Sequence, residues 1–248
     1  MTESTIGAEA TAVRSERPQF FARSAIVMAA IVVLSFPLTY YLPVASGTRD
    51  FDTLYHLHAL VFFAWIALYV LQTQLTARGQ IARHREIGLA GFALTGVMIP
   101  LGYWIAQRAA VHRLAAGHEN PYEFTWYNVI DITSFAVLMT ASILLVTRHK
   151  EWHRRLTFTA AAYLTLDAAT RWTLKVPGVD PFILDLASYA VIYPFLAALG
   201  WFDWRTLKHL HPATITCTLA LIPLHLSSAW IARSDWWNNL APGLIGPP

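Results

Sequence analysis

The sequence has little charge, since only 13% of its 248 residues are Asp, Glu, Lys or Arg. Soluble domains carry about 25% charged residues, and half of that share cannot coat a globule of this size in water. Hydrophobic residues make up 56% of the chain, which favours a protein whose surface faces lipid. The basic residues are spread over short connections and form no single patch, so nucleic-acid binding is not indicated.

The sequence also has a single cysteine, Cys217. An intrachain disulfide is therefore excluded, and so is a zinc or iron–sulfur centre held by several cysteines of this chain. The motifs of soluble enzymes are missing as well: there is no Gly-rich phosphate loop, Gly-x-Ser-x-Gly, His-Glu-x-x-His or Cys-x-x-Cys. Soluble-enzyme mechanisms receive little support from this sequence.

Seven apolar runs occupy most of the chain. Each has about 17–22 residues, long enough to cross about 30 Å of hydrocarbon at about 1.5 Å per residue. We predict an all-α polytopic membrane bundle with about seven transmembrane helices, at 24–45, 54–74, 87–105, 127–147, 156–172, 182–201 and 213–230. Pro37 is expected to kink the first helix, and the fifth is the shortest and most polar.

Polar segments flank the predicted bundle on both sides. We interpret residues 1–23 as a flexible cytoplasmic tail, residues 24–232 as the transmembrane bundle and residues 233–248 as a non-cytoplasmic tail. With the N-terminus placed inside, twelve Lys and Arg residues fall on the cytoplasmic side and six on the other. This excess predicts an N-in, C-out topology in a bacterial inner membrane. The sequence predicts no oligomeric state.

Ionisable residues inside the predicted spans are costly in lipid, so each suggests a function. Counted along the helices at about 1.5 Å per residue, five of them fall roughly 5–8 Å below the non-cytoplasmic boundary. These five are His58, Asp131, Asp167, Asp185 and His225. The sequence therefore predicts one polar layer, built by five helices, near the non-cytoplasmic face.

We interpret this layer first as a metal site, because imidazoles and carboxylates together suit zinc, iron or manganese. His58 and His225 are the expected ligands. Asp131, Asp185 and His56 are further candidate ligands, although His56 points to nearly the opposite helix face from His58. The expected chemistry is a metal-dependent hydrolytic or redox reaction on a lipid or another hydrophobic small molecule.

Three residues are the candidates for catalysis in such a site. Asp131 or Asp167 would act as general base or orient a ligand. Arg171 lies four residues after Asp167, where the two side chains can pair on one helix face. Arg171 is therefore expected to hold that carboxylate or to steer an anionic group.

Three other interpretations stay open. His58 and His225 lie at similar depth on separate helices, as bis-imidazole ligation of haem b requires, and the chain would then pass electrons to a redox partner. The Asp and His layer, with prolines inside several spans, also suits a proton-coupled transporter. The polar residues could instead be interhelical hydrogen bonds, which stabilise by only about 0.6 kcal/mol each. His112 and His118, in the outer loop before 127–147, could cap the layer.

Several short motifs resemble a known group of proteins. They are the run from His56 to Trp65 with Gln72, His84-Arg85 with Gly88, His153-Arg154-Arg155-Leu156, and Asp203 followed by His211-Pro212-Ala213. From about residue 50 to 215 the chain resembles uncharacterised multi-pass membrane proteins of bacteria, which implies a helical bundle with His at helix ends and no established activity. It is more loosely similar to transmembrane cytochromes b and to seven-helix zinc hydrolases of the alkaline-ceramidase and adiponectin-receptor type. Only His225 stands where those hydrolases have a spaced His pair.

Overall fold

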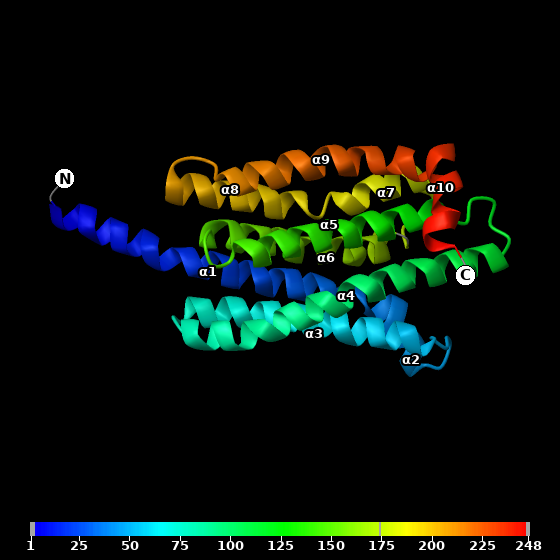
Figure 1. Ribbon diagram of the computed structural model, residues 1–248, viewed down its shortest axis with the longest axis horizontal. Coiled ribbons are helices and arrows are strands. Elements are labelled where there is room, and N and C mark those ends of the chain that lie inside the picture. The colour runs from blue at the N-terminus through cyan, green and yellow to red at the C-terminus, as the bar shows by residue number, and fades with distance from the viewer. Residues whose placement is uncertain (1–2, 174, 247–248) are drawn as a thin grey trace.

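The computed structural model describes residues 3–173 and 175–246, with side chains from residue 18 onward except at residue 38. Across these ranges the chain is helical and contains no strand. The long helices lie alongside one another in a single elongated bundle (Figure 1). One end holds the N-terminus and the α8–α9 connection, and the other holds α2 and α10. We call these the N-terminal end and the α10 end.

The helices follow one another with short connections. In chain order they are α1 (Glu3–Ser35), the π-helical segment η1 (Pro37–Tyr41), α2 (Leu42–Ala45), α3 (Thr53–Ala77), α4 (Ile81–Ala115), α5 (Glu123–Leu145), α6 (Lys150–Thr173), α7 (Pro181–Tyr189), α8 (Tyr193–Leu207), α9 (Pro212–Ala232) and α10 (Asp235–Ile245). Six stretches are long and apolar enough to cross a membrane: α1 from Pro18, α3, α4, α5, α7 with α8, and α9. The predicted all-α bundle is confirmed, and its apolar helices are those of a multi-pass membrane protein.

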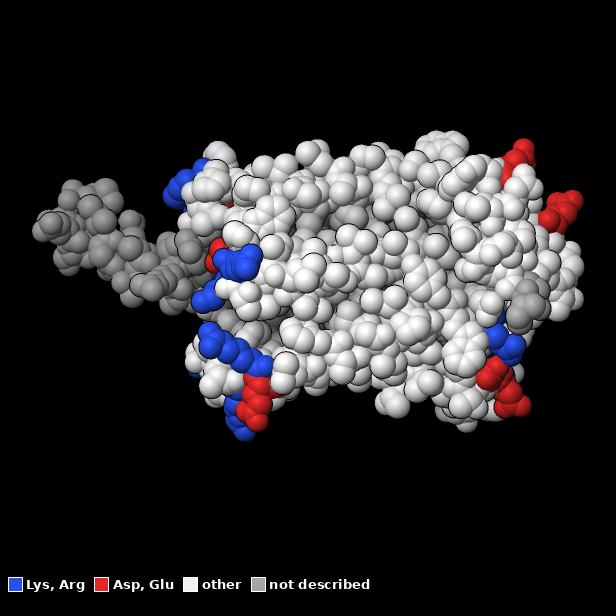
Figure 2. Space-filling model, in the orientation of Figure 1, with Lys and Arg blue, Asp and Glu red and all other residues white. Residues whose placement is uncertain are grey.

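Charged side chains gather at the two ends of the molecule. In Figure 2 the middle of the bundle shows a broad band without Lys, Arg, Asp or Glu on the face in view. Many apolar side chains of the long helices are exposed, among them Leu60, Val137 and Leu219, which are 67%, 62% and 69% exposed. Such a surface suits a hydrocarbon solvent and would be unfavourable in water.

Two predicted spans are interrupted at prolines. The expected kink at Pro37 is confirmed, because α1 ends at Ser35 and the amides of Tyr40 and Tyr41 both donate to the Phe36 carbonyl. The span predicted over 182–201 lies within the apolar stretch Pro181–Leu207, but it is not one regular helix, since α7 ends at Tyr189 and α8 begins at Tyr193. Pro194 lies in the first turn of α8, where its missing N–H cannot continue a helix from α7.

Helical structure extends past both boundaries predicted for the bundle. Residue 24 falls inside α1, and the Phe20 ring before it stacks on Phe202 with 4.5 Å between ring centroids. At the other end, residues expected to form a tail form α10. Ser234 caps this helix by accepting a hydrogen bond from the Trp237 amide, and the Trp237 indole donates to the Tyr122 carbonyl at 2.9 Å. Both additions bury aromatic surface that would otherwise face water.

Helix α6 is the most buried helix of the bundle. Thirteen of its 24 residues are buried, against seven of 25 in α3. It packs against α1, α5, α7, α8 and α9. The run Ala160–Ala162 is fully buried, which lets neighbouring backbones approach closely. Because other helices surround it, α6 can carry polar residues that would be costly on a helix facing lipid.

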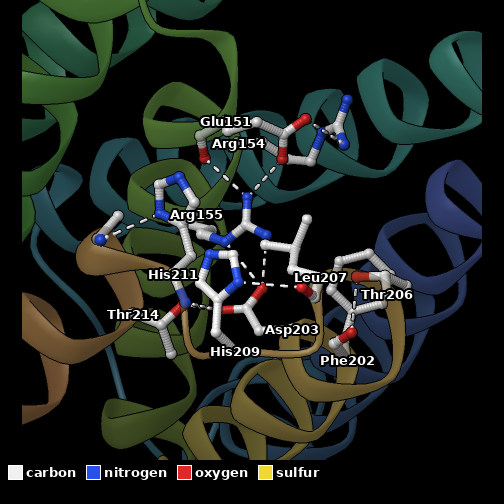
Figure 3. A network of polar contacts seen from close by, with 11 residues as sticks. Glu151, Arg154, Arg155, Phe202, Asp203, Thr206, Leu207, His209, His211 and Thr214 are labelled. Atoms are coloured by element: carbon white, nitrogen blue, oxygen red, sulfur yellow. Dashed lines mark hydrogen bonds and ion pairs between the residues drawn. The ribbon is translucent and has the colours of Figure 1, made fainter.

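A buried ion pair joins α6 to α8 near the N-terminal end (Figure 3). Arg155 donates from Nε and Nη2 to Asp203 Oδ1 at 3.0 and 2.5 Å, and both side chains are fully buried. Asp203 Oδ2 accepts from the His211 amide and the Thr214 hydroxyl at the start of α9. Arg155 Nη1 also reaches the half-exposed carboxylate of Glu151 at 2.5 Å. The network therefore fixes three helices to one another.

Removing one partner of this buried pair is expected to destabilise the fold. Asp203→Leu should lower the free energy of unfolding by about 3–5 kcal/mol, because it leaves the Arg155 charge buried without a counter-charge. Unfolding in mixed detergent micelles, followed by circular dichroism, measures this loss. Glu151→Gln is the control and should cost about 1 kcal/mol or less, since Glu151 is half-exposed and its charge is screened by solvent. The double variant Arg155→Met with Asp203→Leu should recover most of the loss, and no recovery would contradict this account.

A second prediction concerns the contact between α4 and α5. A Cβ added at Gly102 would lie 2.7 Å from Ile132 Cγ1, whereas one added at Gly96 on the same helix would meet nothing within 4 Å. Gly102→Ala should therefore destabilise the fold by about 1–3 kcal/mol through overpacking. Gly96→Ala should be neutral or stabilise slightly, because Ala favours helix over Gly. Equal effects of both substitutions in the same unfolding assay would show that the close contact does not matter.

Candidate functional site

A small cavity lies between α1, α3 and α6, towards the α10 end. His58, Asp167 and Arg171 line it together with apolar side chains that include Phe36. The space open to the centre of a water molecule is about 20 Å³, which is enough for about one water. The cavity therefore brings together three of the residues that the sequence predicts for the polar layer.

Arg171 is held in place at this cavity by two contacts. Its Nη1 donates to the Asp167 backbone carbonyl at 2.8 Å, and its Cζ lies 4.1 Å from the centroid of the Phe36 ring. The expected i, i+4 arrangement on one helix face is thus present, although this hydrogen bond reaches the backbone of Asp167 and not its carboxylate. The cation–π contact lets the guanidinium lie against an apolar wall.

His58 presents an imidazole nitrogen that has no protein partner. Its ring packs on Phe62, with 4.0 Å between ring centroids. Its Nδ1 is buried and makes no hydrogen bond to any described residue. Buried polar atoms almost always have a hydrogen-bond partner. An unpaired nitrogen beside a water-sized cavity therefore indicates that a water or a ligand bonds to it, or that it takes up a proton.

The carboxyl groups of Asp131 on α5 and Asp167 on α6 lie close enough for their charges to interact. The Tyr189 hydroxyl on α7 donates to Asp131 Oδ1 at 3.5 Å, a long hydrogen bond. Arg171 is the cation whose charge acts on Asp167. The pair therefore holds two acidic groups beside one nearby cation, in a part of the bundle that other helices screen from lipid.

His225 on α9 lies on the far side of this acidic pair. Its side chain is only 1% exposed, and a hydrogen bond of 2.6 Å joins its Nε2 to the Tyr163 hydroxyl. The Tyr189 ring stacks on the imidazole at 4.2 Å between centroids and 15° between planes. Its Nδ1 has no hydrogen-bond partner among the described residues. Tyr189 therefore contacts both His225 and Asp131.

The polar side chains of the predicted layer thus form two groups, one at the His58 cavity and one around His225, and the interaction between the Asp131 and Asp167 charges joins them. We call the whole set the row. It runs from His58 and Arg171 through Asp167 and Asp131, and then through two tyrosines to His225. Sequence reasoning missed the tyrosines, Tyr163 and Tyr189. Tyr163 stands four residues before Asp167, on the same helix face, and this spacing was the available signal.

Two predicted site residues lie outside the row. Asp185 accepts hydrogen bonds from Tyr127 at 2.8 Å and from Arg233 at 2.7 Å, in an ion-pair cluster at the α10 end. His56 is exposed and its Nδ1 is 2.5 Å from the Tyr40 hydroxyl. Asp185 Oδ2 accepts from both a phenol and a cation, and His56 bonds to Tyr40, so these two residues make their polar contacts outside the row.

The proposed metal and haem groups find no matching donor set. Among the described residues, no group of three or more His, Cys, Asp and Glu side chains is arranged to hold a metal ion. His58 and His225 do not line a common cavity, because the residues around the His58 cavity come from α1, the α1–η1 junction, α3 and α6, and none of them comes from α9. Metal and haem binding both stay untested predictions.

Comparison with protein-family models, with curated proteins and with solved structures finds no match to this chain.

The hydrogen bond between Tyr163 and His225 is expected to stabilise the fold, and this can be tested by removing the hydroxyl group. Tyr163→Phe should lower the free energy of unfolding by about 1–3 kcal/mol, because it leaves Nε2 of a buried imidazole without a partner. Tyr193→Phe is the matched control: the Tyr193 ring also lies near His225, at 6.0 Å between centroids, but its hydroxyl makes no bond to the imidazole. Detergent unfolding curves compare the two variants, and equal losses would contradict the assignment.

Proposed function

We propose that this chain is a proton-coupled membrane transporter whose proton-binding site is the carboxyl pair Asp131 and Asp167. The observation that supports this proposal is the connected row of titratable side chains inside the bundle. Such residues are costly in a membrane and commonly mark proton relays. The donor geometry gives a metal-dependent reaction less support, because the histidines stand at opposite ends of the row.

The carboxyl pair has the properties that reversible proton binding requires. Two carboxylates whose charges interact in a medium of low dielectric cannot both ionise cheaply, so the pair favours a state in which one of them holds a proton. Arg171 balances the remaining negative charge. A gain or loss of one proton therefore changes the net charge of the layer. This change in charge can alter the affinity for a solute or the balance between two conformations.

The neighbouring groups give the proton places to move. The His58 cavity has room for about one water beside Asp167. On the other side, Tyr189 contacts Asp131 and His225, and both phenols and imidazoles can accept and donate protons. The row thus supplies alternating donors and acceptors across α3, α6, α5, α7 and α9.

We further propose that α6 is a seventh span and that the N-terminal end faces the cytoplasm of a bacterial cell. Helix α6 has 24 residues, enough for about 36 Å at about 1.5 Å per residue, and it lies alongside α5 (Figure 1). Because of its polar residues, α6 is not among the helices that are apolar enough to span a membrane by composition. Neighbouring helices shield these polar residues from lipid. The excess of Lys and Arg in the connections at the N-terminal end supports this orientation.

The acidic pair provides the central test. In infrared titrations of the protein in liposomes, we expect a carboxyl C=O band that appears and disappears with pH. Asp131→Asn and Asp167→Asn should each remove this band. Each should also reduce proton flux under an imposed pH gradient at least about tenfold, which corresponds to about 1.4 kcal/mol or more in the barrier.

Glu86→Gln is the control, because Glu86 is exposed at the start of α4, at the N-terminal end. It should leave both the band and the flux unchanged. A wild-type flux equal to that of protein-free liposomes would overturn the proposal, as would a flux that neither Asp variant alters. Zinc or iron that co-purifies with the wild type and is lost in His58→Ala would favour metal-dependent chemistry in its place.

A further inference from the structure

A groove of about 410 Å³ opens at the α10 end, apart from the polar row. Its walls are the segment before α3, the first turn of α3, the last turns of α4 and the start of α5. Ligand sites commonly have volumes of about 300–1,000 Å³ with mostly apolar walls and a few convergent polar groups. Here Phe51, Tyr55 and Phe124 supply the aromatic walls, and Arg49, His112 and Arg113 supply the basic groups.

The acidic residue Asp52 in this groove is neutralised by its own neighbours. Its Oδ1 accepts from the Leu54 amide at 3.2 Å as the cap of α3, and its Oδ2 pairs with Arg108 at 2.6 Å. The amide and the guanidinium together hold the pKa of Asp52 below its usual range, so it stays ionised and paired. Asp52 therefore shapes the groove without adding net negative charge.

Arg49 and Arg113 are not neutralised in this way. Within the part of the chain that the structure describes, neither of them forms an ion pair. Asp50 is the remaining acidic residue in the walls, set against two arginines and His112. The groove thus keeps an excess of positive charge that a bound anion could balance.

The two guanidinium groups are placed against aromatic rings. Arg49 Cζ lies 4.8 Å from the Phe51 centroid, and Arg113 Cζ lies 6.0 Å from the Phe124 centroid. An arginine that stacks on a ring keeps its N–H edge directed outward for an anion. The buried Nε of Arg113 also has no hydrogen-bond partner among the described residues, so a donor without an acceptor stands in this wall.

We propose that this groove binds a phosphoryl group that carries an apolar moiety. Arg49 and Arg113 come from different walls, so they need an acceptor whose oxygens point in several directions. A phosphoryl group has such tetrahedral oxygens, whereas the two oxygens of a carboxylate are coplanar. The aromatic walls would take the apolar part. The phosphoryl group could belong to a phospholipid headgroup or to a soluble organic phosphate, and the binding does not depend on proton movement through the row.

Calorimetric titration of the full chain in detergent tests this proposal. The probes are phenyl phosphate, a short-chain phosphatidic acid below its micelle concentration, and benzoate as the carboxylate comparison. We expect saturable binding of one molecule per chain for at least one phosphate probe. Benzoate should bind at least about tenfold more weakly. Binding of phenyl phosphate would identify a soluble phosphate as ligand, and binding of phosphatidic acid alone would identify a lipid headgroup.

Three variants and one control decide whether this groove is the site. Arg49→Gln and Arg113→Gln should each weaken the binding about tenfold, and Ala109→Phe should do the same by filling the groove while its charges remain. Arg85→Gln, at the start of α4 at the N-terminal end, should bind as the wild type does. All variants must elute as the wild type in size exclusion. Absence of binding by both phosphates, equal binding of benzoate, or wild-type affinity in all three groove variants would each overturn the proposal.

Discussion

The bundle depends on one constraint: its most polar long helix must be kept away from lipid. Helix α6 carries Arg155, Asp167 and Arg171, and each of these would be expensive on a surface that faces hydrocarbon. The apolar helices around it bury it, and its row of small alanines allows them to come close. Both the buried ion pair with Asp203 and the row of polar side chains use this shielded interior. The outward faces of the bundle can then remain almost entirely apolar.

Much of the fold could be predicted from the sequence, because a membrane leaves few options for an apolar run of about 20 residues. The six most apolar stretches were recognised on this basis, and so was the interruption at Pro37. The sequence did not predict the break between α7 and α8, because a proline such as Pro194 can either kink a continuous helix or lie in the first turn of a new one. The packing of Phe20 and the formation of α10 depend on contacts with Phe202 and Tyr122, which are far away in the sequence.

The sequence predicts how deep in the membrane each candidate site residue lies. It does not predict how the helices that carry these residues are placed around one another. A fixed rise per residue predicts which residues share a level, and two of these residues, His58 and Asp167, line one cavity. The rotation and position of each helix depend on packing, which the sequence does not state. Asp185 therefore pairs with Arg233 instead. The ion pair of Arg155 with Asp203 joins residues 48 positions apart, so Arg155 looked like an ordinary positive charge in a connection.

The same ion pair has a consequence for biosynthesis. Helix α6 leaves the ribosome before α8, so Arg155 is made well before the aspartate that neutralises it. Ionisable residues are costly in an isolated inserted helix, and α6 carries Asp167 and Arg171 as well as Arg155, without the apolar surface to offset such a cost. We therefore expect α6 to insert late, in the company of α7 and α8, and to wait beside the insertion machinery until its partners are complete. A chain truncated before Asp203 would then leave α6 outside the membrane.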